Sequence, residues 1–452
     1  MQGPRDSSLS VRLFHVLTIG FLLIALVFGG ASRDEVISSD IVGLAALPVL
    51  GGAIWRLRGG VDRQWRLPMA LLAAVAALPL LQLIPLPPEI WTQMPGRAPV
   101  VEGLRIAGVP PGWAPLSLSP QATWSSFLSL PPFAAVFLAA LSVTDETRRR
   151  MVLCVIAVGV ASVFLGAAQL AGGDDSPLRF YAITNKSAAV GFFSNRNHLA
   201  SLLICVVVLA SGWVTEAAIR RPVPRLTLAA GLVAVALATI GVGLTGSRAG
   251  LLLLAPAGIG CVAMAWRVGQ GRGRELLLLL GGAFLAAVAI VYLSFGQAIA
   301  RLQSGFSEDV RLIAASVTWP AIKAFMPFGS GMGTFVPVYK MFEGPEAVMN
   351  TYINHAHDDW LEILLEGGIP AALLALAFLV WFGRRAFELW RRGGVEQTAA
   401  RAAALCVLLL LIHSAMDYPL RTPALATVFA FCCGAMLARP GRRLHQGRSL
   451  AA

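Results

Sequence analysis

Residues 151–171 read MVLCVIAVGVASVFLGAAQLA, twenty-one consecutive residues without a charged side chain. A hydrocarbon core about 30 Å thick needs roughly 20 apolar residues as a helix, and only helices and closed barrels satisfy their backbone hydrogen bonds there. The run is too continuously apolar for the alternating strands of a membrane barrel. The stretch therefore predicts a transmembrane helix.

Similar runs recur along the chain of 452 residues, of which 57% are hydrophobic and only 13% charged, with a mean hydropathy of +0.72. A soluble protein is about 25% charged, so this composition excludes an ordinary water-exposed surface. We predict an all-α polytopic membrane protein with about twelve transmembrane helices. The predicted spans are 12–30, 40–55, 67–86, 123–143, 151–171, 198–214, 226–245, 249–266, 275–293, 359–382, 401–416 and 422–438.

Lys and Arg residues are distributed unequally between the two sides of the membrane. With the N-terminus inside, the inside segments hold 24 of the 36 Lys and Arg and 8 of the 24 Asp and Glu, a net +16 against −4 outside. This asymmetry follows the positive-inside rule, so we expect both termini in the cytoplasm and no nucleic-acid partner. The inside segments are 1–12, 56–66, 144–150, 215–225, 267–275, 383–401 and 439–452.

The chain divides into three parts. Residues 1–293 hold the first nine helices and an outside loop at 87–122, residues 294–358 form a large outside loop, and residues 359–452 hold three helices and a basic tail. The apolar run at 13–30 is longer than the 7–15 residues of a signal-peptide core, so we interpret it as an uncleaved first helix. All six cysteines fall inside predicted helices, so the outside loops need no disulfide framework.

The two long outside loops differ in chemistry. Loop 87–122 is rich in Pro, Gly and Trp, and we predict a cover on the bundle or the membrane interface without a chemical role. The segment around Arg311 has helical apolar spacing, which Pro320 is expected to kink or interrupt. The large loop ends in Asn-His-Ala-His-Asp-Asp at 354–359, where either aspartate suits a helix N-cap and Glu362 suits a capping box.

Polar clusters stand at helix starts on the outside face. Arginine beside a helix N-terminus makes an anion site, and its planar fork suits phosphate. Each residue also has a structural alternative, as an interfacial anchor, a helix cap, a salt-bridge partner or a solvated loop residue. The candidates, all outside, are Arg196, Asn197, His198, Arg248, Arg311, His355, His357 and Asp358, with His413, Asp417 and Arg421 nearby.

His355, His357 and Asp359 also resemble a metal-ligand string. Such a site needs further His or Asp ligands from the surrounding fold, and the string runs straight into a membrane helix through Trp360. We therefore predict neither a metal nor another cofactor.

Five motifs in order resemble the bacterial O-antigen ligase and polymerase superfamily of membrane glycosyltransferases. The similarity covers roughly residues 65–438, with the large loop before the last helices in the expected place. The motifs are GFFSNRNH at 191–198, TGSRAG at 245–250, the segment from Arg311 to PFGSGMGTF at 327–335, HAHDDWLE at 355–362 with EGGIP at 366–370, and HSAMDYPLRTP at 413–423.

The resemblance implies a GT-C-like bundle at the bacterial inner membrane with its active site on the periplasmic face. It implies an undecaprenyl-diphosphate-linked glycan as donor and lipid A–core or another lipid-linked glycan as acceptor. The family's essential arginines correspond to Arg248 and Arg311, and its essential histidine corresponds to His357. The residue that follows this histidine is usually Asn, whereas this chain has Asp358.

The residues agree with this chemistry. Two arginines can stabilise charge on a diphosphate leaving group, and a histidine can accept the proton of an acceptor hydroxyl. No Asp-x-Asp metal signature lies in an outside loop, so we expect metal-independent transfer. The motifs leave ligase and polymerase activity open, for lipopolysaccharide or exopolysaccharide. A membrane transporter with ionisable residues along a path is the alternative from another class.

Overall fold

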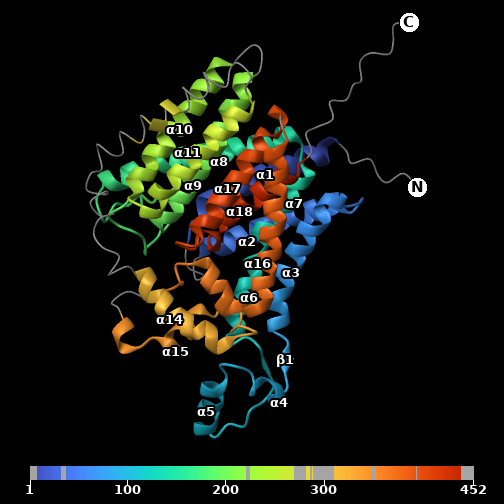
Figure 1. Cartoon of the computed structure of the whole chain (residues 1–452), viewed down its shortest axis with the longest axis vertical. Coiled ribbons are helices and arrows are strands. Elements are labelled where there is room, and N and C mark those ends of the chain that lie inside the picture. The colour runs from blue at the N-terminus through green and yellow to red at the C-terminus, as the bar shows by residue number, and fades with distance from the viewer. Residues whose placement is uncertain are drawn as a thin grey trace.

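The computed structural model describes residues 8–31, 37–219, 224–268, 310–348, 353–392 and 394–438, together with Gly281, Gly282, Phe284, Leu285 and Val288. Within these residues, ten helical segments are long and apolar enough to cross a membrane, and one shorter apolar helix follows them. The all-α polytopic prediction is confirmed (Figure 1). The predicted helix at 275–293 lies largely outside the described residues.

The apolar helices follow the predicted spans with shifted ends. α8 begins at Asp145, six residues earlier than predicted, because Thr144 caps it by accepting a hydrogen bond from the Thr147 N–H group. The helices are α1 (Ser8–Phe28), α2 (Ile37–Leu57), α3 (Arg66–Gln82), α7 (Pro131–Ser142), α8 (Asp145–Ala171), α9 (Arg196–Ile219), α10 (Arg225–Thr245), α11 (Arg248–Val268), α16 (Asp359–Arg391), α17 (Thr398–His413) and α18 (Pro423–Leu437).

One predicted helix is divided. The span predicted at 123–143 consists of α6 (Pro120–Leu128) and α7, separated by Ser129 and Leu130. Pro131 and Pro132 begin α7 and have no backbone N–H group to continue the hydrogen bonds of α6. The break therefore follows from two prolines inside an otherwise apolar run.

Helix α9 lies at the centre of the bundle. Every side chain from His198 to Gly212 is buried, and α9 packs against α8, α10, α11 and α17. Neighbouring helices approach closely where one side chain is small: a Cβ atom on Gly434 would lie 2.6 Å from the Cβ of Ala140. Small residues at helix contacts are typical of membrane bundles, where lipid supplies no hydrophobic driving force between helices.

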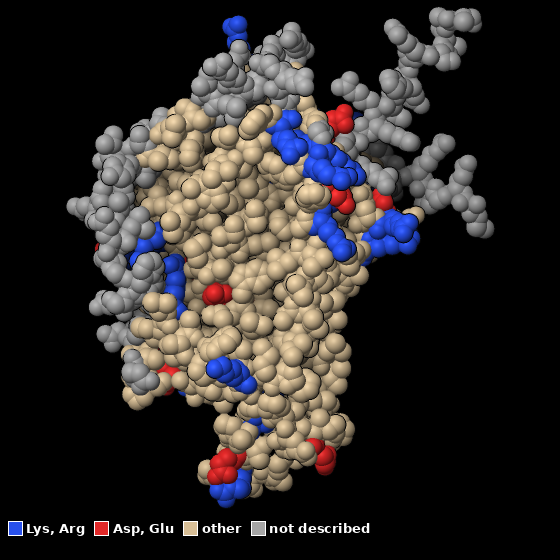
Figure 2. All heavy atoms as spheres, viewed as in Figure 1, with Lys and Arg blue, Asp and Glu red and all other residues tan. Residues whose placement is uncertain are grey.

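Because successive spans alternate in direction, the helix ends gather at two opposite ends of the bundle. At one end of the bundle, Arg385 donates to the carbonyl of Met436, and Gln64 donates to that of Leu437. At the other end, Ala424 N donates to Gly29 O, and Ser194 N donates to Gly30 O. The first end carries the arginines of the α2–α3 connection, of the first two turns of α8 and of the C-terminal part of α16. Figure 2 shows basic side chains gathered towards the upper end of the molecule, above a broad and mostly uncharged surface.

The loop at 87–122 forms a small separate unit at the lower end of the molecule (Figure 1). It contains α4 (Pro88–Trp91), α5 (Ala98–Ile106) and β2 (Ala114–Pro115). β2 pairs antiparallel with β1 (Pro85–Leu86), which directly precedes the loop, with Pro85 opposite Pro115. Trp91 is buried and donates its indole hydrogen to Gly112 O at 2.8 Å. This unit contacts the large loop, because a Cβ on Gly96 would lie 2.3 Å from the Phe325 ring.

The described part of the large loop packs against the first turns of α16. It contains α14 (Val310–Phe325) and α15 (Phe335–Phe342). Of the predicted kink or interruption at Pro320, the interruption does not occur, since α14 continues through Pro320 as far as Phe325. A helix tolerates an internal proline when its freed carbonyl finds another partner or solvent, and Pro320 is exposed.

A bend in α16 receives the glycine-rich turn that follows α14. Gly368 has φ 55° and ψ −148° inside α16, and Pro370 follows it. Gly331 N donates to Glu366 O, and Ile369 N donates to Pro327 O, both within 2.9 Å. A Cβ on Gly368 would lie 2.3 Å from Pro327 O, so only glycine permits this approach. The bend fixes the first two turns of α16 against the large loop.

Candidate functional site

The candidate site is built where four chain segments meet at one end of the bundle. These segments are the start of α9, the residues before α16, the end of α17 and the turn after α17, which includes the short helix η5 (Pro419–Arg421). In Figure 1 they lie above α14 and α15, at the level where the large loop joins the spans. Of the predicted residues, Asn197, His198, His355, His357 and Asp358 are brought together here.

Asp417 lies at the centre of this site and is completely buried. Its Oδ1 lies 3.2 Å from His357 Nδ1 and also accepts from Tyr418 N, and its Oδ2 accepts from Asn197 Nδ2 at 2.5 Å. Burial alone would raise the pKa of Asp417. The hydrogen bond from His357 and the charges of the neighbouring histidines outweigh burial, so this pKa lies well below its usual range. Both carboxyl oxygens accept hydrogen bonds, Oδ1 from Tyr418 N and Oδ2 from Asn197 Nδ2, as those of an ionised carboxylate do.

His357 is held in an unusual backbone conformation. Its φ is 55°, the only positive φ among the described residues other than glycine. Such a conformation costs about 1–3 kcal/mol and persists when the surroundings fix it. The surroundings here are the hydrogen bond to Asp417 on one side and the N-cap of α16 on the other. The His357 side chain is 21% exposed, so a substrate can reach the ring.

Asp358 is the N-cap of α16, as predicted. Its Oδ1 accepts from Trp360 N at 2.9 Å and from Leu361 N at 3.1 Å. Burial raises the pKa of Asp358, and these backbone hydrogen bonds oppose the rise only in part. Asp358 thus anchors the helix start beside His357.

Glu362 does not complete the predicted capping box. Its Oε1 lies 2.8 Å from His355 Nδ1, and its Oε2 accepts from Ala356 N at 3.0 Å. The capping box fails because Asp358 rather than Asp359 is the cap, which moves the box position from Glu362 to Leu361. Glu362 instead ties the segment before the helix back onto its first turn.

Tyr418 is surrounded by three histidines. Its ring centroid lies 4.3 Å from that of His355 and 5.0 Å from those of His357 and His198. Tyr418 is buried, so its ring forms a wall that sets the orientation of all three imidazoles. Tyr418 was not predicted as a site residue from the sequence.

His198, one of these three histidines, and a fourth, His413, are completely buried. His413 Nδ1 lies 2.6 Å from Ser201 Oγ, one turn into α9. Neither ring nitrogen of His198 has a hydrogen-bond partner among the described residues. His198 faces the edge of Tyr418, so it packs within the site and does not reach its surface.

Arg421 pairs with three carboxylates of α16. Its guanidinium lies 3.3 Å from Asp359, 3.0 Å from Glu362 and 3.2 Å from Glu366. Burial would lower the pKa of Arg421, but the three carboxylates outweigh it and raise the pKa well above its usual value. Glu366 Oε1 also accepts from Phe335 N, so the cluster connects α15, α16 and the turn after α17.

The role of these carboxylates was missed from the sequence. Asp359 and Glu362 were interpreted as residues of a helix start, and Glu366 only as part of the motif at 366–370. Their spacing places all three on one face of α16. Three acids on one face of a buried helix require a cation, and Arg421 follows Asp417 in the same short connection. Three acids on one helix face together with Arg421 were the sequence signal that could have predicted this cluster.

The three arginines predicted as site residues each lie in the first turn of a helix. Arg248 is the first residue of α11, which is capped by the Ser247 hydroxyl accepting from Gly250 N. Arg311 lies in the first turn of α14, and its charge acts on His413. Arg196 begins α9, where its N–H group donates to Asn185 Oδ1. The convergence of Arg248 and Arg311 on one diphosphate stays a prediction.

The members of the suspected metal string have different partners. His355 contacts Glu362, His357 contacts Asp417, and Asp359 contacts Ser414 and Arg421. Across the described ranges, no group of three His, Cys, Asp or Glu side chains could hold a metal ion. The arrangement is therefore a set of hydrogen-bonded pairs around Asp417 and Arg421.

The comparisons with known proteins agree with the motifs. Residues 232–376, about a third of the chain, match the O-antigen ligase family model. This segment runs from α10 through the large loop into α16, and it contains Arg248, Arg311, His355 and His357. No curated protein matches the chain. The family match supports the sequence resemblance of this membrane protein to the O-antigen ligase and polymerase superfamily.

Proposed function

We propose that the protein transfers a glycan from an undecaprenyl-diphosphate carrier to a hydroxyl group of lipid A–core or of another lipid-linked glycan. The reaction belongs to the biosynthesis of surface polysaccharide. The site would face the periplasm from the bacterial inner membrane, because the basic connections lie at the opposite end of the bundle. The observation that carries the proposal is the 3.2 Å contact between His357 Nδ1 and the buried carboxylate of Asp417.

This contact fixes the roles of the two imidazole nitrogens. An ionised Asp417 can only accept, so His357 Nδ1 carries the hydrogen of the 3.2 Å contact. The lone pair is then on Nε2, which is free to accept the proton of the acceptor hydroxyl. Asp417 also stabilises the imidazolium that forms, as a buried carboxylate does for other catalytic histidines.

The reaction balances as a single displacement. The acceptor oxygen forms a bond to the anomeric carbon while the bond from that carbon to the carrier diphosphate breaks. The hydroxyl proton goes to His357 Nε2, and undecaprenyl diphosphate leaves with the bonding electrons. One such step inverts the anomeric configuration and calls for no metal.

Arg248 and Arg311 are proposed to bind the diphosphate. Each lies in the first turn of its helix, where backbone N–H groups and the helix dipole also favour an anion. Arg196, Asn197, His198, His355 and Asp358 are proposed to shape the surrounding substrate site. Of these, Asn197 and His355 act through contacts to the carboxylates of Asp417 and Glu362.

The test is transfer by the purified protein in lipid. A synthetic undecaprenyl-diphosphate oligosaccharide is offered with lipid A–core or with a second lipid-linked repeat unit as acceptor. Consumption of lipid A–core identifies a ligase, and growth of the lipid-linked glycan identifies a polymerase. A chelator in the same assay should leave the rate unchanged. No product with either acceptor, from protein that binds the donor, would contradict the proposal.

A further inference from the structure

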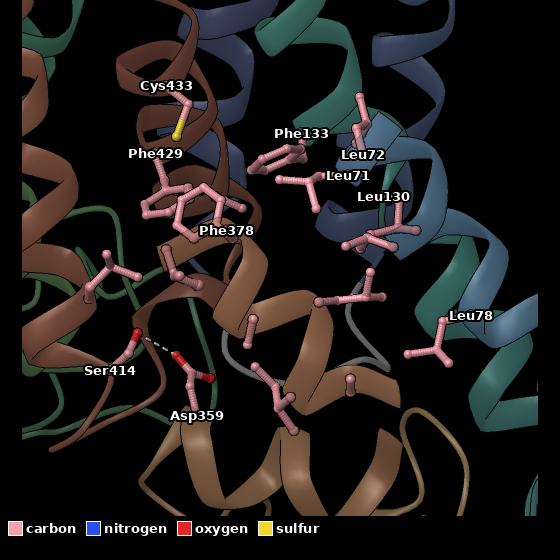
Figure 3. Close-up of a pocket in the computed structure, with 18 of the residues that line it drawn as sticks. Leu71, Leu72, Leu78, Leu130, Phe133, Asp359, Phe378, Ser414, Phe429 and Cys433 are labelled. Atoms are coloured by element: carbon pink, nitrogen blue, oxygen red, sulfur yellow. Dashed lines mark hydrogen bonds between the residues drawn. The ribbon is translucent and has the colours of Figure 1, made fainter. Parts of the chain in front are cut away.

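An apolar cavity of about 350 Å³ opens between α3, α7, α16 and α18. Its size lies within the range of small-molecule sites, roughly 300–1,000 Å³. In Figure 3, Leu71, Leu130 and Phe133 stand on one side of the cavity, and Phe378 and Phe429 stand on the other. The walls therefore offer hydrocarbon and aromatic surface to an occupant.

The polar end of the cavity belongs to the candidate site. Asp359 and Ser414 line this end and are joined by a 2.8 Å hydrogen bond (Figure 3). Asp359 follows His357 by two residues and pairs with Arg421. A molecule that filled the cavity would thus have one end beside the proposed base.

The cavity is continuous with the lipid-facing surface of its helices. Val75 lines it and is 42% exposed, and on either side Leu67 of α3 and Leu376 of α16 are more than half exposed. Such side chains on membrane spans face the hydrocarbon of the bilayer. The occupant that can enter from this direction is the hydrocarbon chain of a lipid.

The position and charge of the cavity favour the acceptor lipid over the donor. Arg248 and Arg311 begin α11 and α14, and neither helix lines the cavity. Among the described residues, the charged side chain that lines the polar end is the Asp359 carboxylate and no Lys or Arg lines the cavity, so a diphosphate there would meet negative charge without a lining cation. Hydroxyl groups, in contrast, can donate hydrogen bonds to carboxylates.

We propose that this cavity holds a hydrocarbon chain of the lipid that carries the acceptor hydroxyl. The inference rests on the proposed transferase function and adds the route by which the second substrate reaches His357. Lipid tails are as apolar as leucine, so moving a chain from the bilayer into the cavity gains little. The cavity therefore orients the acceptor, and its loss should raise the acceptor KM about five-fold or more with little change in the donor KM.

The test fills the cavity with a larger side chain. Ala375→Trp on α16 and Leu72→Trp on α3 place an indole inside, since both residues line the cavity. The matched controls are Leu376→Trp and Leu67→Trp, which lie on the same helices and are exposed outside it. The two filling variants should raise the acceptor KM and the controls should not. An unchanged acceptor KM, or a raised donor KM instead, overturns the inference.

A second measurement does not depend on turnover. Lipid A–core and the undecaprenyl-diphosphate glycan, each with a diazirine in its hydrocarbon chain, are photocrosslinked to the protein, and the labelled peptides are mapped. We expect acceptor label on α3 and α16 that falls in Ala375→Trp and persists in Leu376→Trp. Equal label in both variants overturns the inference even for an inactive protein, whereas failure of the proposed function appears as absence of product from the wild type.

Discussion

His357 Nδ1 lies 3.2 Å from Asp417 Oδ1, although 60 residues and the whole of α16 and α17 separate the two in sequence. The contact joins the last residues of the large loop to the turn between the final two helices. Together with the Tyr418 ring, it holds the imidazole of His357 in place. The proposed chemistry depends on this pair.

Asp417→Asn should therefore lower the transfer rate by about 10²–10⁴-fold. The amide keeps the shape of the carboxylate but loses its charge, and it no longer requires the hydrogen of His357 to be on Nδ1. The measurement is kcat in the lipid-reconstituted assay, with donor binding measured separately. Asp40→Asn, at an exposed aspartate of α2, is the control. A rate near that of the wild type would mean that Asp417 does not orient the base.

Arg421→Gln should destabilise the protein by about 3–5 kcal/mol, because it leaves three carboxylates buried without their cation. The thermal unfolding midpoint in detergent measures this loss. Arg150→Gln removes an ion pair whose two side chains are both more than half exposed, and it should change the midpoint little. Equal midpoints for the two variants would show that the Arg421 cluster does not stabilise the fold.

The two proposed diphosphate arginines should act together. Arg248→Lys and Arg311→Lys keep the charge but lose the planar fork, so each should raise the donor KM. If both bind one diphosphate, the double variant should lose less free energy of binding than the sum of the single losses. Strict additivity in this cycle would argue for separate sites.

The side of the membrane can be tested with single cysteines in a background that lacks the six native ones. Val348→Cys, at an exposed position of the large loop, should react with an impermeant thiol reagent in intact spheroplasts. Glu396→Cys, exposed in the connection between α16 and α17, should react only after the membrane is opened. The reverse pattern would invert the topology and place the site in the cytoplasm.

The sequence was sufficient for those features that depend on local composition. Long uncharged runs such as 151–171 identify spans wherever they occur, and the N-cap at Asp358 depends only on its neighbours. The break between α6 and α7 within the predicted span 123–143 also depends only on local sequence. Pro131 and Pro132, which cause it, were interpreted as part of one apolar run.

Contacts between residues far apart in the chain could not be predicted from the sequence. His355, His357 and Asn197 were identified from motifs, yet the groups that hold them, Glu362 and Asp417, act through contacts that exist only after folding. Asp417 and Arg421 are separated by three residues but serve different partners, one binding histidines and the other binding carboxylates. The pattern of charged residues in the sequence does not predict these different partners.

The most direct measurement is single-turnover transfer by His357→Ala with donor already bound. Removing the proposed base should slow the chemical step by about 10²–10⁴-fold while protein abundance and donor affinity stay at wild-type values. His15→Ala, a histidine of α1 near Arg56 and Arg150 at the opposite end of the bundle, is the matched control and should react at the wild-type rate. A His357→Ala rate close to wild type would exclude His357 as the base and contradict the central claim.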